Sequence, residues 1–167
     1  FVRPTSSIKR EAFFSIIESY ALKNSIDIYN NKIFLDLFAG IGSMGLEAIS
    51  RGFGSAIFFE NNIEVIKVLK KNCQNICREE QYLIKCENVL LSEININFEN
   101  ISIIYIDPPY YKYNLDNVFT ILQKKISKKT VIGVESGIKD NFKIPDKLDI
   151  IKQKKYGKTK LSILTLS

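Results

Sequence analysis

Residues 33–48 read IFLDLFAGIGSMGLEA, and this stretch decides the fold. Its apolar start is typical of a buried strand, and its end has the apolar spacing of a helix. Between them, Gly40, Gly42 and Gly45 match the G-x-G-x-x-G spacing that lets a backbone approach a ligand, and Glu60 follows 20 residues after Gly40. An acidic residue there can accept hydrogen bonds from two ribose hydroxyls. The stretch predicts a strand–turn–helix site for a ligand carrying adenosine; close packing at the turn is the alternative interpretation.

Apolar strand-like runs and helix-like stripes alternate through most of the chain. We expect strands at residues 33–38, 55–59, 82–86, 101–106 and 130–134, and helices up to residue 24, after Gly45, across 66–77 and across 115–125. Residues 148–155 and 161–166 alternate around Gly157 and predict a closing antiparallel hairpin.

The strands are apolar runs rather than half-polar alternations, which is typical of a parallel sheet covered by helices on both faces. The pattern therefore predicts an α/β fold with a doubly wound, mostly parallel seven-stranded sheet and the C-terminal antiparallel hairpin. We expect a single domain over residues 1–167, with an N-terminal entry and helix at 1–24 and a Rossmann-like core at 33–167.

The composition excludes several kinds of chemistry. The chain has 167 residues and no histidine, so Ser-His-Asp and Cys-His catalysis, imidazole proton transfer and histidine-ligated metal sites are excluded. Cys73, Cys77 and Cys86 have no CxxC spacing, which argues against a disulfide framework and for a reducing compartment. No apolar run approaches the length of a membrane span. We expect no metal, no membrane association and a cytoplasmic location.

Positive charge is concentrated toward the C-terminus. Residues 120–160 hold 12 lysines and 4 acidic residues, a local charge of +8 in a chain whose net charge is +6. Phosphate-bearing partners are the usual reason for such a region, and a solvated lysine-rich surface is the alternative. Part of the region could flank the mouth of the site and part could lie on the far edge. If Lys124, Lys125, Lys128 and Lys129 contact phosphate, their replacement by Gln should flatten the salt dependence of nucleic-acid binding.

Two features favour S-adenosylmethionine over a nicotinamide cofactor at the glycine turn. Asp36 lies four residues before Gly40. A carboxylate there suits a ligand with an ammonium and a sulfonium group and would repel a pyrophosphate. The second feature is Asp107-Pro108-Pro109-Tyr110, which directly follows the apolar run 101–106.

The Asp-Pro-Pro-Tyr stretch suits an exocyclic amine on a base. Proline cannot extend a ladder, so Pro108 and Pro109 end the strand and fix a rigid turn. We expect the Asp107 side chain and the Pro108 carbonyl to face one small space, where two acceptors fit the two hydrogens of –NH2. Tyr110 offers a flat face on which the base can stack. Holding both hydrogens would localise the nitrogen lone pair toward an incoming methyl group. A Pro-Pro turn with a capping Asp is the alternative interpretation.

With these motifs in place, the chain resembles a known family. Asp-Pro-Pro-Tyr after a fourth strand is similar to the signature of class I, S-adenosylmethionine-dependent amino-methyltransferases. More closely, the chain resembles the RsmD family of bacterial 16S ribosomal RNA guanine-N2 methyltransferases. The matching stretches run in order over nearly the whole chain: residues 3–5, 9–14, 34–40, 45–48, 50–52, 106–110, 134–136 and 155–157 with Thr159.

The resemblance implies a Rossmann-like class I methyltransferase fold and methyl transfer from S-adenosylmethionine to the N2 amine of a guanine in small-subunit ribosomal RNA, at position 966 in bacterial rRNA numbering. It implies a partner that is ribosomal RNA or a small-subunit assembly intermediate, and a monomeric enzyme. The residues that would hold the guanine are Asp107, Pro108, Pro109 and Tyr110. Those that would contact the cofactor are Asp36, Phe38, Ala39, Gly40, Gly42, Gly45, Glu60, Asn61 and Asn88. Those that would contact nucleic acid are Arg3, Thr5, Lys9, Arg10 and Lys112. Family members usually carry a basic, glycine-containing segment before Arg-Pro-Thr, which the printed sequence does not include.

Three other functions stay open at this point. Adenine-N6 methylation of DNA or RNA uses the same class of site, and Asp at position 107 with the Arg-Pro-Thr entry argues weakly against it. An NAD-dependent oxidoreductase would explain the glycines and Glu60 but not Asp36. A non-catalytic rRNA assembly factor would not need the intact motifs. Calorimetry with S-adenosylmethionine and with NAD separates the two enzyme classes, and binding of neither would favour the assembly factor.

Overall fold

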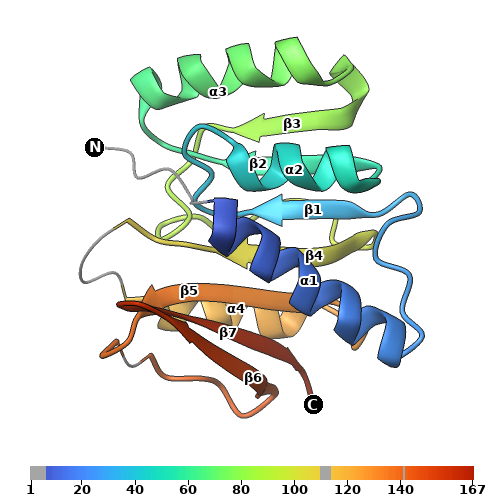
Figure 1. Ribbon diagram of the computed structural model, residues 1–167. Helices are drawn as coiled ribbons and strands as arrows, with labels where there is room; N and C mark the ends of the chain where they lie inside the picture. Colours follow the sequence, from blue (N-terminus) through green and yellow to red (C-terminus); the bar gives the residue numbers. More distant parts are fainter. Residues whose placement is uncertain (1–6, 110–113, 141) are drawn as a thin grey trace.

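The computed structural model describes residues 7–109, 114–140 and 142–167 (Figure 1). Its strands are β1 (Ile33–Asp36), β2 (Ser55–Phe59), β3 (Tyr82–Lys85), β4 (Ile101–Ile106), β5 (Val131–Gly137), β6 (Leu148–Tyr156) and β7 (Thr159–Leu166). Its helices are α1 (Ser7–Lys23), α2 (Ser43–Arg51), α3 (Ile63–Ile76) and α4 (Asp116–Lys125), with a 3-10 turn at Glu79–Gln81. None of the described helices combines the length and the apolar character needed to cross a bilayer.

All seven strands form one sheet in the order β3-β2-β1-β4-β5-β7-β6. The pairs from β3 to β5 are parallel, whereas β7 runs antiparallel to both β5 and β6. Helices cover both faces, with α1, α2 and α3 on one face and α4 on the other (Figure 1). The predicted doubly wound, mostly parallel seven-stranded sheet with a closing antiparallel hairpin is confirmed.

Aromatic side chains pack α1 onto the sheet. Phe13 lies over Gly133 of β5, where an added Cβ would come within 2.3 Å of the ring. The same ring meets Tyr105 of β4 edge-on at 5.0 Å between centroids and lies 6.4 Å from Phe34 of β1. Edge-to-face contacts of this kind add to the stabilisation from burial. These contacts hold the second turn of α1 against β1, β4 and β5.

Several strand boundaries differ from the prediction by one to three residues, and two of these differences have a local reason. β1 ends at Asp36 rather than at residue 38 because the Asp36 carboxylate accepts a hydrogen bond from the Phe38 amide at 3.2 Å. Such a turn within two residues draws the chain out of the ladder. β5 extends to Gly137 rather than ending at residue 134, because Gly137 still pairs with Thr159 of β7. An apolar run predicts the buried part of a strand, but the neighbouring strand with which it pairs decides how long the strand is.

Candidate active site

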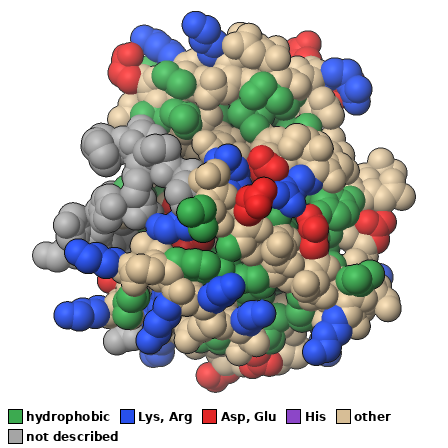
Figure 2. Space-filling view, in the orientation of Figure 1, with side chains coloured by type: hydrophobic (Ala, Val, Ile, Leu, Met, Phe, Trp, Pro, Cys, Tyr) green, Lys and Arg blue, Asp and Glu red, His purple; other side chains and the backbone are tan. Residues whose placement is uncertain are grey.

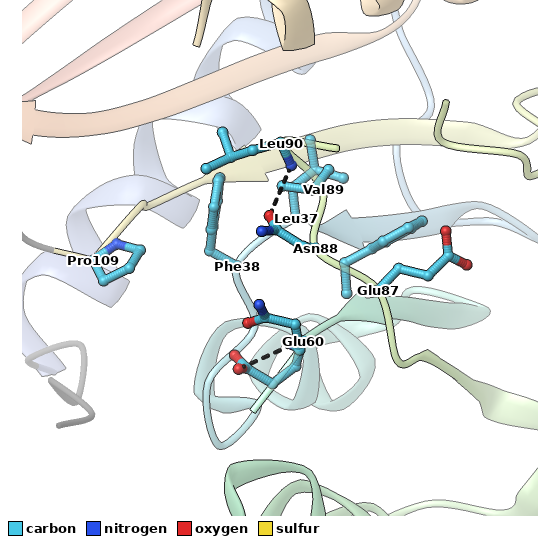
Figure 3. A pocket seen from close by; sticks show the side chains of 10 residues that line it. Leu37, Phe38, Glu60, Glu87, Asn88, Val89, Leu90 and Pro109 are labelled. Atoms are coloured by element: carbon cyan, nitrogen blue, oxygen red, sulfur yellow. Dashed lines mark hydrogen bonds between the residues drawn. The ribbon is translucent and has the colours of Figure 1, made fainter. Parts of the chain in front are cut away.

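The candidate site lies at the carboxyl ends of the parallel strands. In a doubly wound sheet these ends meet at one edge, where ligands bind. A hollow that opens to solvent lies at this edge. It is lined by Leu37, Phe38, Phe59, Glu60, Asn61, Glu87, Asn88, Val89, Leu90 and Pro109 (Figure 3). Four of the predicted cofactor residues and one of the predicted guanine residues therefore line a single hollow.

Asp36 is a buried carboxyl group at the end of β1. Its side chain is 1% exposed. The pKa of Asp36 is raised to about 8, and burial is the largest cause. The hydrogen bond from the Phe38 amide lowers this pKa, and the negative charges of Asp107 and Glu60 add to the rise. Removal from water disfavours a charged carboxylate unless an opposite charge is near. A cationic ligand beside Asp36 would lower this pKa and favour the charged carboxylate.

The glycine turn between β1 and α2 needs two residues with positive φ. Gly40 has φ 58° and Gly42 has φ 94°, a region that glycine enters without steric cost. An added Cβ on Gly42 would lie 2.6 Å from the Leu69 side chain of α3. From the same helix, Asn72 donates a hydrogen bond from Nδ2 to the Ile41 carbonyl at 2.9 Å. The turn is thus shaped by its own backbone and held by α3.

Glu60 connects this turn to the end of β2. Its Oε1 accepts a hydrogen bond from the Gly40 amide at 2.9 Å. Its Oε2 accepts from the amides of Asn61 at 3.2 Å and Asn62 at 3.0 Å. A carboxylate has about four acceptor positions, so one position remains for a ligand hydroxyl without loss of these bonds. The sequence predicted the ligand contact of Glu60 and missed its contribution to the turn.

The segment after β3 supplies the opposite wall of the hollow. Asn88 Oδ1 accepts a hydrogen bond from the Leu90 amide at 3.0 Å, which fixes the side chain against the lining (Figure 3). Glu87 accepts a hydrogen bond from the Ser92 hydroxyl at 2.9 Å and lies 3.4 Å from the Lys85 ammonium. Val89 is 2% exposed and anchors the segment in the core. Apolar surface and amide groups together suit a flat heterocycle that carries polar edges.

The turn after β4 borders the hollow from the other side. Asp107 and Pro108 are half-buried, and Pro109 is exposed and lines the hollow. Asp107 is close enough to Asp36 for its charge to raise the Asp36 pKa. Tyr110 and Lys112, and likewise Arg3 and Thr5, lie outside the described residues.

Among the predicted residues outside the lining, three lie in the helices α1 and α2. Gly45 is in α2, where an added Cβ would come within 2.3 Å of the Phe58 ring, so this glycine lets α2 approach β2. Lys9 and Arg10 are in the first turns of α1, and Arg10 Nε lies 3.5 Å from a Glu47 carboxylate oxygen of α2. That ion pair makes Arg10 part of the contact between the two helices.

Five lining residues were missed by the sequence analysis: Leu37, Phe59, Glu87, Val89 and Leu90. Glu87, Val89 and Leu90 are close neighbours of the predicted site residue Asn88 in the sequence. Their position after the third strand was therefore the signal that could have identified them. Within the described ranges, no group of acidic or cysteine side chains has the arrangement of a metal site. The arrangement can hold a cation beside Asp36 and an adenosine in the hollow, with the Asp107 turn next to both.

Comparison with known proteins agrees with this geometry. The family model described as Conserved hypothetical protein 95 matches residues 1–165. The Ribosomal RNA small subunit methyltransferase D of Buchnera aphidicola is 30% identical over 92% of this chain and 76% of its own length. A solved structure of a conserved hypothetical protein from Streptococcus pyogenes is 26% identical, with a TM-score of 0.73 over 88% of this chain and 94% of that chain.

A second solved structure supports the fold class. It is an RNA methyltransferase from Salinibacter ruber in complex with S-adenosyl-L-homocysteine, with 11% identity and a TM-score of 0.68 over 98% of this chain and 94% of that chain. At this identity the likeness concerns the fold, and it confirms the predicted Rossmann-like class I methyltransferase fold. Together with the match of the family model over nearly the whole length, these findings show that the chain belongs to the family described as Conserved hypothetical protein 95, the RsmD methyltransferase family.

Proposed function

We propose that this protein transfers a methyl group from S-adenosylmethionine to the exocyclic N2 amine of a guanine in small-subunit ribosomal RNA. The observation that carries the proposal is the buried Asp36 carboxyl, which lies next to Asp107 and Glu60 beside the hollow. A pyrophosphate would add negative charge beside these three carboxyl groups, whereas an ammonium and a sulfonium group would favour their charged forms.

The residues present fit this cofactor, which supplies an electrophilic methyl group when bound. Asp36 would face its cationic methionine end. Glu60 has acceptor capacity left for a ribose hydroxyl, since its three backbone hydrogen bonds use three of about four positions. Phe38 and Leu90 supply apolar walls and Asn61 and Asn88 supply polar groups for an adenine, in the hollow shown in Figure 3.

The turn after β4 would position the acceptor amine. The Asp107 carboxylate and the Pro108 carbonyl are two acceptors for the two N–H groups of the amine, and both would hold the nitrogen lone pair toward the methyl carbon. The new N–C bond forms as the C–S bond breaks, and the amine then releases one proton to Asp107 or to water. Fixed geometry accounts for most of the acceleration in such a displacement. The base must leave its stack to reach the turn, which favours a loop or an incompletely assembled rRNA as substrate.

The choice of ribosomal RNA rests on the relatives. The Buchnera aphidicola relative is named as a small-subunit rRNA methyltransferase, and the Salinibacter ruber structure is titled an RNA methyltransferase. Guanine N2 follows from the resemblance of residues 106–110 to the family signature. The proposed substrate also implies a cytoplasmic enzyme whose partner is ribosomal RNA or a small-subunit assembly intermediate.

Replacing Asp107 tests the proposal. Asp107→Ala removes one of the two acceptors for the amine, so we expect cofactor affinity within about twofold of the unchanged chain and a loss of methyl transfer of at least 100-fold, as for other groups that position or accept a proton. Calorimetry with S-adenosylmethionine measures the first quantity. Mass spectrometry of nucleosides from a 16S rRNA transcript or from small-subunit particles measures the second and identifies the methylated base.

Asp146→Ala is the matched control, because Asp146 is exposed in the loop before β6. It should leave both quantities unchanged. Methylated adenine in the digest would replace the guanine assignment, and an Asp107→Ala chain with more than about a tenth of the activity would contradict the role of Asp107 in positioning.

A further inference from the structure

The lysines of the C-terminal region form two groups. One group lies at the carboxyl ends of the parallel strands and the other lies toward their amino ends. β5 and β7 run antiparallel, and Gly137 at the carboxyl end of β5 pairs with Thr159 at the start of β7. Tyr156 at the end of β6 pairs with the same Thr159. The end of the β6–β7 hairpin therefore lies at the edge where the candidate active site lies, as Figure 1 shows.

The strand register connects this hairpin end directly to the Asp107 turn. Ile106 pairs with Val134, so Asp107 is level with Glu135, the next residue of β5. Glu135 pairs with Leu161, and Leu161 pairs with Lys154. Lys154 is thus level with Asp107 and three strands away, about 14 Å at the usual spacing between strands.

Four lysines surround the hairpin end, and we call Lys154, Lys155, Lys158 and Lys160 the hairpin-end lysines. The first three are exposed and the fourth is half-buried. In Figure 2, Lys and Arg side chains gather on the lower left of the visible face, over this part of the hairpin. The positive charge that the composition indicated is therefore placed beside the mouth of the site.

The fold leaves the hairpin-end lysines without neutralising charge. Lys155 and Lys160 stand directly opposite each other on β6 and β7, an arrangement of like charges that destabilises an antiparallel pair. Among the described residues, none of the four forms an ion pair with a carboxylate: the Lys160 ammonium donates to the Asp140 backbone carbonyl at 3.0 Å, and the Lys154 ammonium lies 5.2 Å from the centre of the Tyr156 ring.

Two basic residues elsewhere on the surface differ in this respect, whereas Lys124, Lys128 and Lys129 also form no ion pair with a carboxylate among the described residues. Lys67 pairs with Glu64 at 3.2 Å and Arg78 pairs with Glu80 at 2.9 Å. Uncompensated like charges at one spot are expected where a polyanion supplies the compensation.

The second group of lysines lies at the other edge. Lys124 lies in the last turn of α4, and Lys128 and Lys129 follow in the connection to β5. β5 begins at Val131, four residues and about 13 Å before the position level with Asp107. Lys125, from the same cluster, donates to the carbonyls of Glu93 and Ile94 and so has a structural contact. The cluster that the sequence made a candidate for phosphate contact therefore lies toward the amino ends of the parallel strands, whereas the site and the hairpin end lie at their carboxyl ends.

We infer that the hairpin-end lysines form a docking surface for the phosphate backbone of the RNA whose base enters the Asp107 turn. This inference rests on the proposed function and adds the surface that holds the rest of the substrate. A base removed from its stack leaves its neighbouring phosphates at the protein surface, and lysines about 14 Å from the reacting position can bind the flanking chain. Phosphate contacts of this kind position the substrate without reading its sequence.

Two triple variants with the same change in charge test the inference. In one, Lys154, Lys155 and Lys158 become Gln; in the matched control, Lys124, Lys128 and Lys129 become Gln. All six side chains are exposed. Binding to a 16S rRNA transcript is measured by fluorescence anisotropy from 50 to 200 mM salt. Each phosphate contact contributes about 0.7 to the slope of log K against log[salt] for single strands, so the hairpin variant should lose about 2 from the slope and the control less than about 0.5.

The outcomes separate this inference from the proposed function. Calorimetry with S-adenosylmethionine should give the same affinity for both variants and the unchanged chain, which shows that both variants fold. If the unchanged chain methylates RNA but the hairpin variant keeps its full salt slope, or the control loses as much, the docking surface is wrong and the proposed function stands. If the unchanged chain binds the cofactor and methylates no RNA, the proposed function itself fails. Binding to anionic lipid vesicles that only the hairpin variant loses, with RNA binding intact, would assign the surface to a membrane and overturn the inference.

Discussion

At the scale of single residues, burial of the Asp36 carboxyl lowers the stability of the folded protein when no ligand is bound. The carboxyl is almost fully buried, and its neighbours Asp107 and Glu60 are also acidic. Its pKa of about 8 in the folded chain lies above the value of 3.8 for an unperturbed aspartate. A residue that serves stability alone would be neutral or paired at this position. The cost is consistent with a group kept for a cationic ligand.

The pKa of Asp36 sets the direction of a pH dependence of stability. Because the folded pKa is the higher one, stability is fully present below pH 3.8 and falls as the pH rises toward about 8. Asp36→Asn removes this dependence and should raise the free energy of unfolding at pH 8 by on the order of 4 kcal/mol, with little effect at pH 4. Urea unfolding at the two pH values measures it. The exposed Asp149→Asn is the control, and an Asp36→Asn chain no more stable at pH 8 would show that Asp36 is already compensated.

Glu60 should affect both the ligand and the glycine turn. Glu60→Ala removes the acceptor for the Gly40, Asn61 and Asn62 amides and the proposed acceptor for the ribose, so cofactor binding should weaken by roughly 1.5–3 kcal/mol. Calorimetry with S-adenosylmethionine and with its 2′-deoxy analogue separates the two contributions. The unchanged chain should prefer the ribose form and the variant should not. A preference that survives in Glu60→Ala would remove the ribose assignment and leave Glu60 a role in the turn alone.

At the scale of helices and strands, the sequence predicted most of what the structure shows. The run 101–106 became β4 with the same bounds, and all six of its residues are buried. Glu60 and Asp107 were predicted as site residues because each follows a strand. Asp36 was predicted from its charge before the glycine turn, and Asn88 from the family resemblance. Their hydrogen bonds were not predictable: whether Glu60 binds a ligand or the Gly40 amide depends on how near the glycine turn comes to β2, which spacing along the chain does not contain.

Gly45 illustrates how a motif residue can act through packing. Its missing Cβ would lie 2.3 Å from Cε1 and 2.6 Å from Cζ of Phe58, so Gly45→Ala forces α2 away from β2. Overpacking of this kind costs about 1–3 kcal/mol, and chemical denaturation should show that loss. Adding Phe58→Leu makes room, so the double variant should be more stable than the sum of the two single changes predicts. Strict additivity would mean that the two side chains do not meet.

At the scale of the whole molecule, the charge is divided between two surfaces that the composition could not separate. The sequence showed +8 within residues 120–160. The sequence did not show that the β6–β7 hairpin brings Lys154 and Lys155 to the same end of the sheet as the site, while Lys128 and Lys129 lie toward the opposite end. The direction of each strand in the sheet decides which end of a segment lies near the site. Acidic groups at the carboxyl ends of β1, β2 and β4 therefore lie at the same end of the sheet as the basic end of the hairpin.

This division predicts opposite salt behaviour for the two proposed ligands. The cofactor would meet a few carboxylates, of which Asp36 is buried, and salt screens buried charges little. RNA would meet exposed lysines and release condensed counterions, so its affinity should fall steeply. Between 50 and 200 mM salt we expect the dissociation constant for S-adenosylmethionine to change by less than about threefold and that for a 16S rRNA transcript to rise more than about tenfold. Calorimetry and anisotropy on one preparation measure both, and an RNA affinity as insensitive to salt as the cofactor affinity would show that the basic hairpin end binds no phosphate.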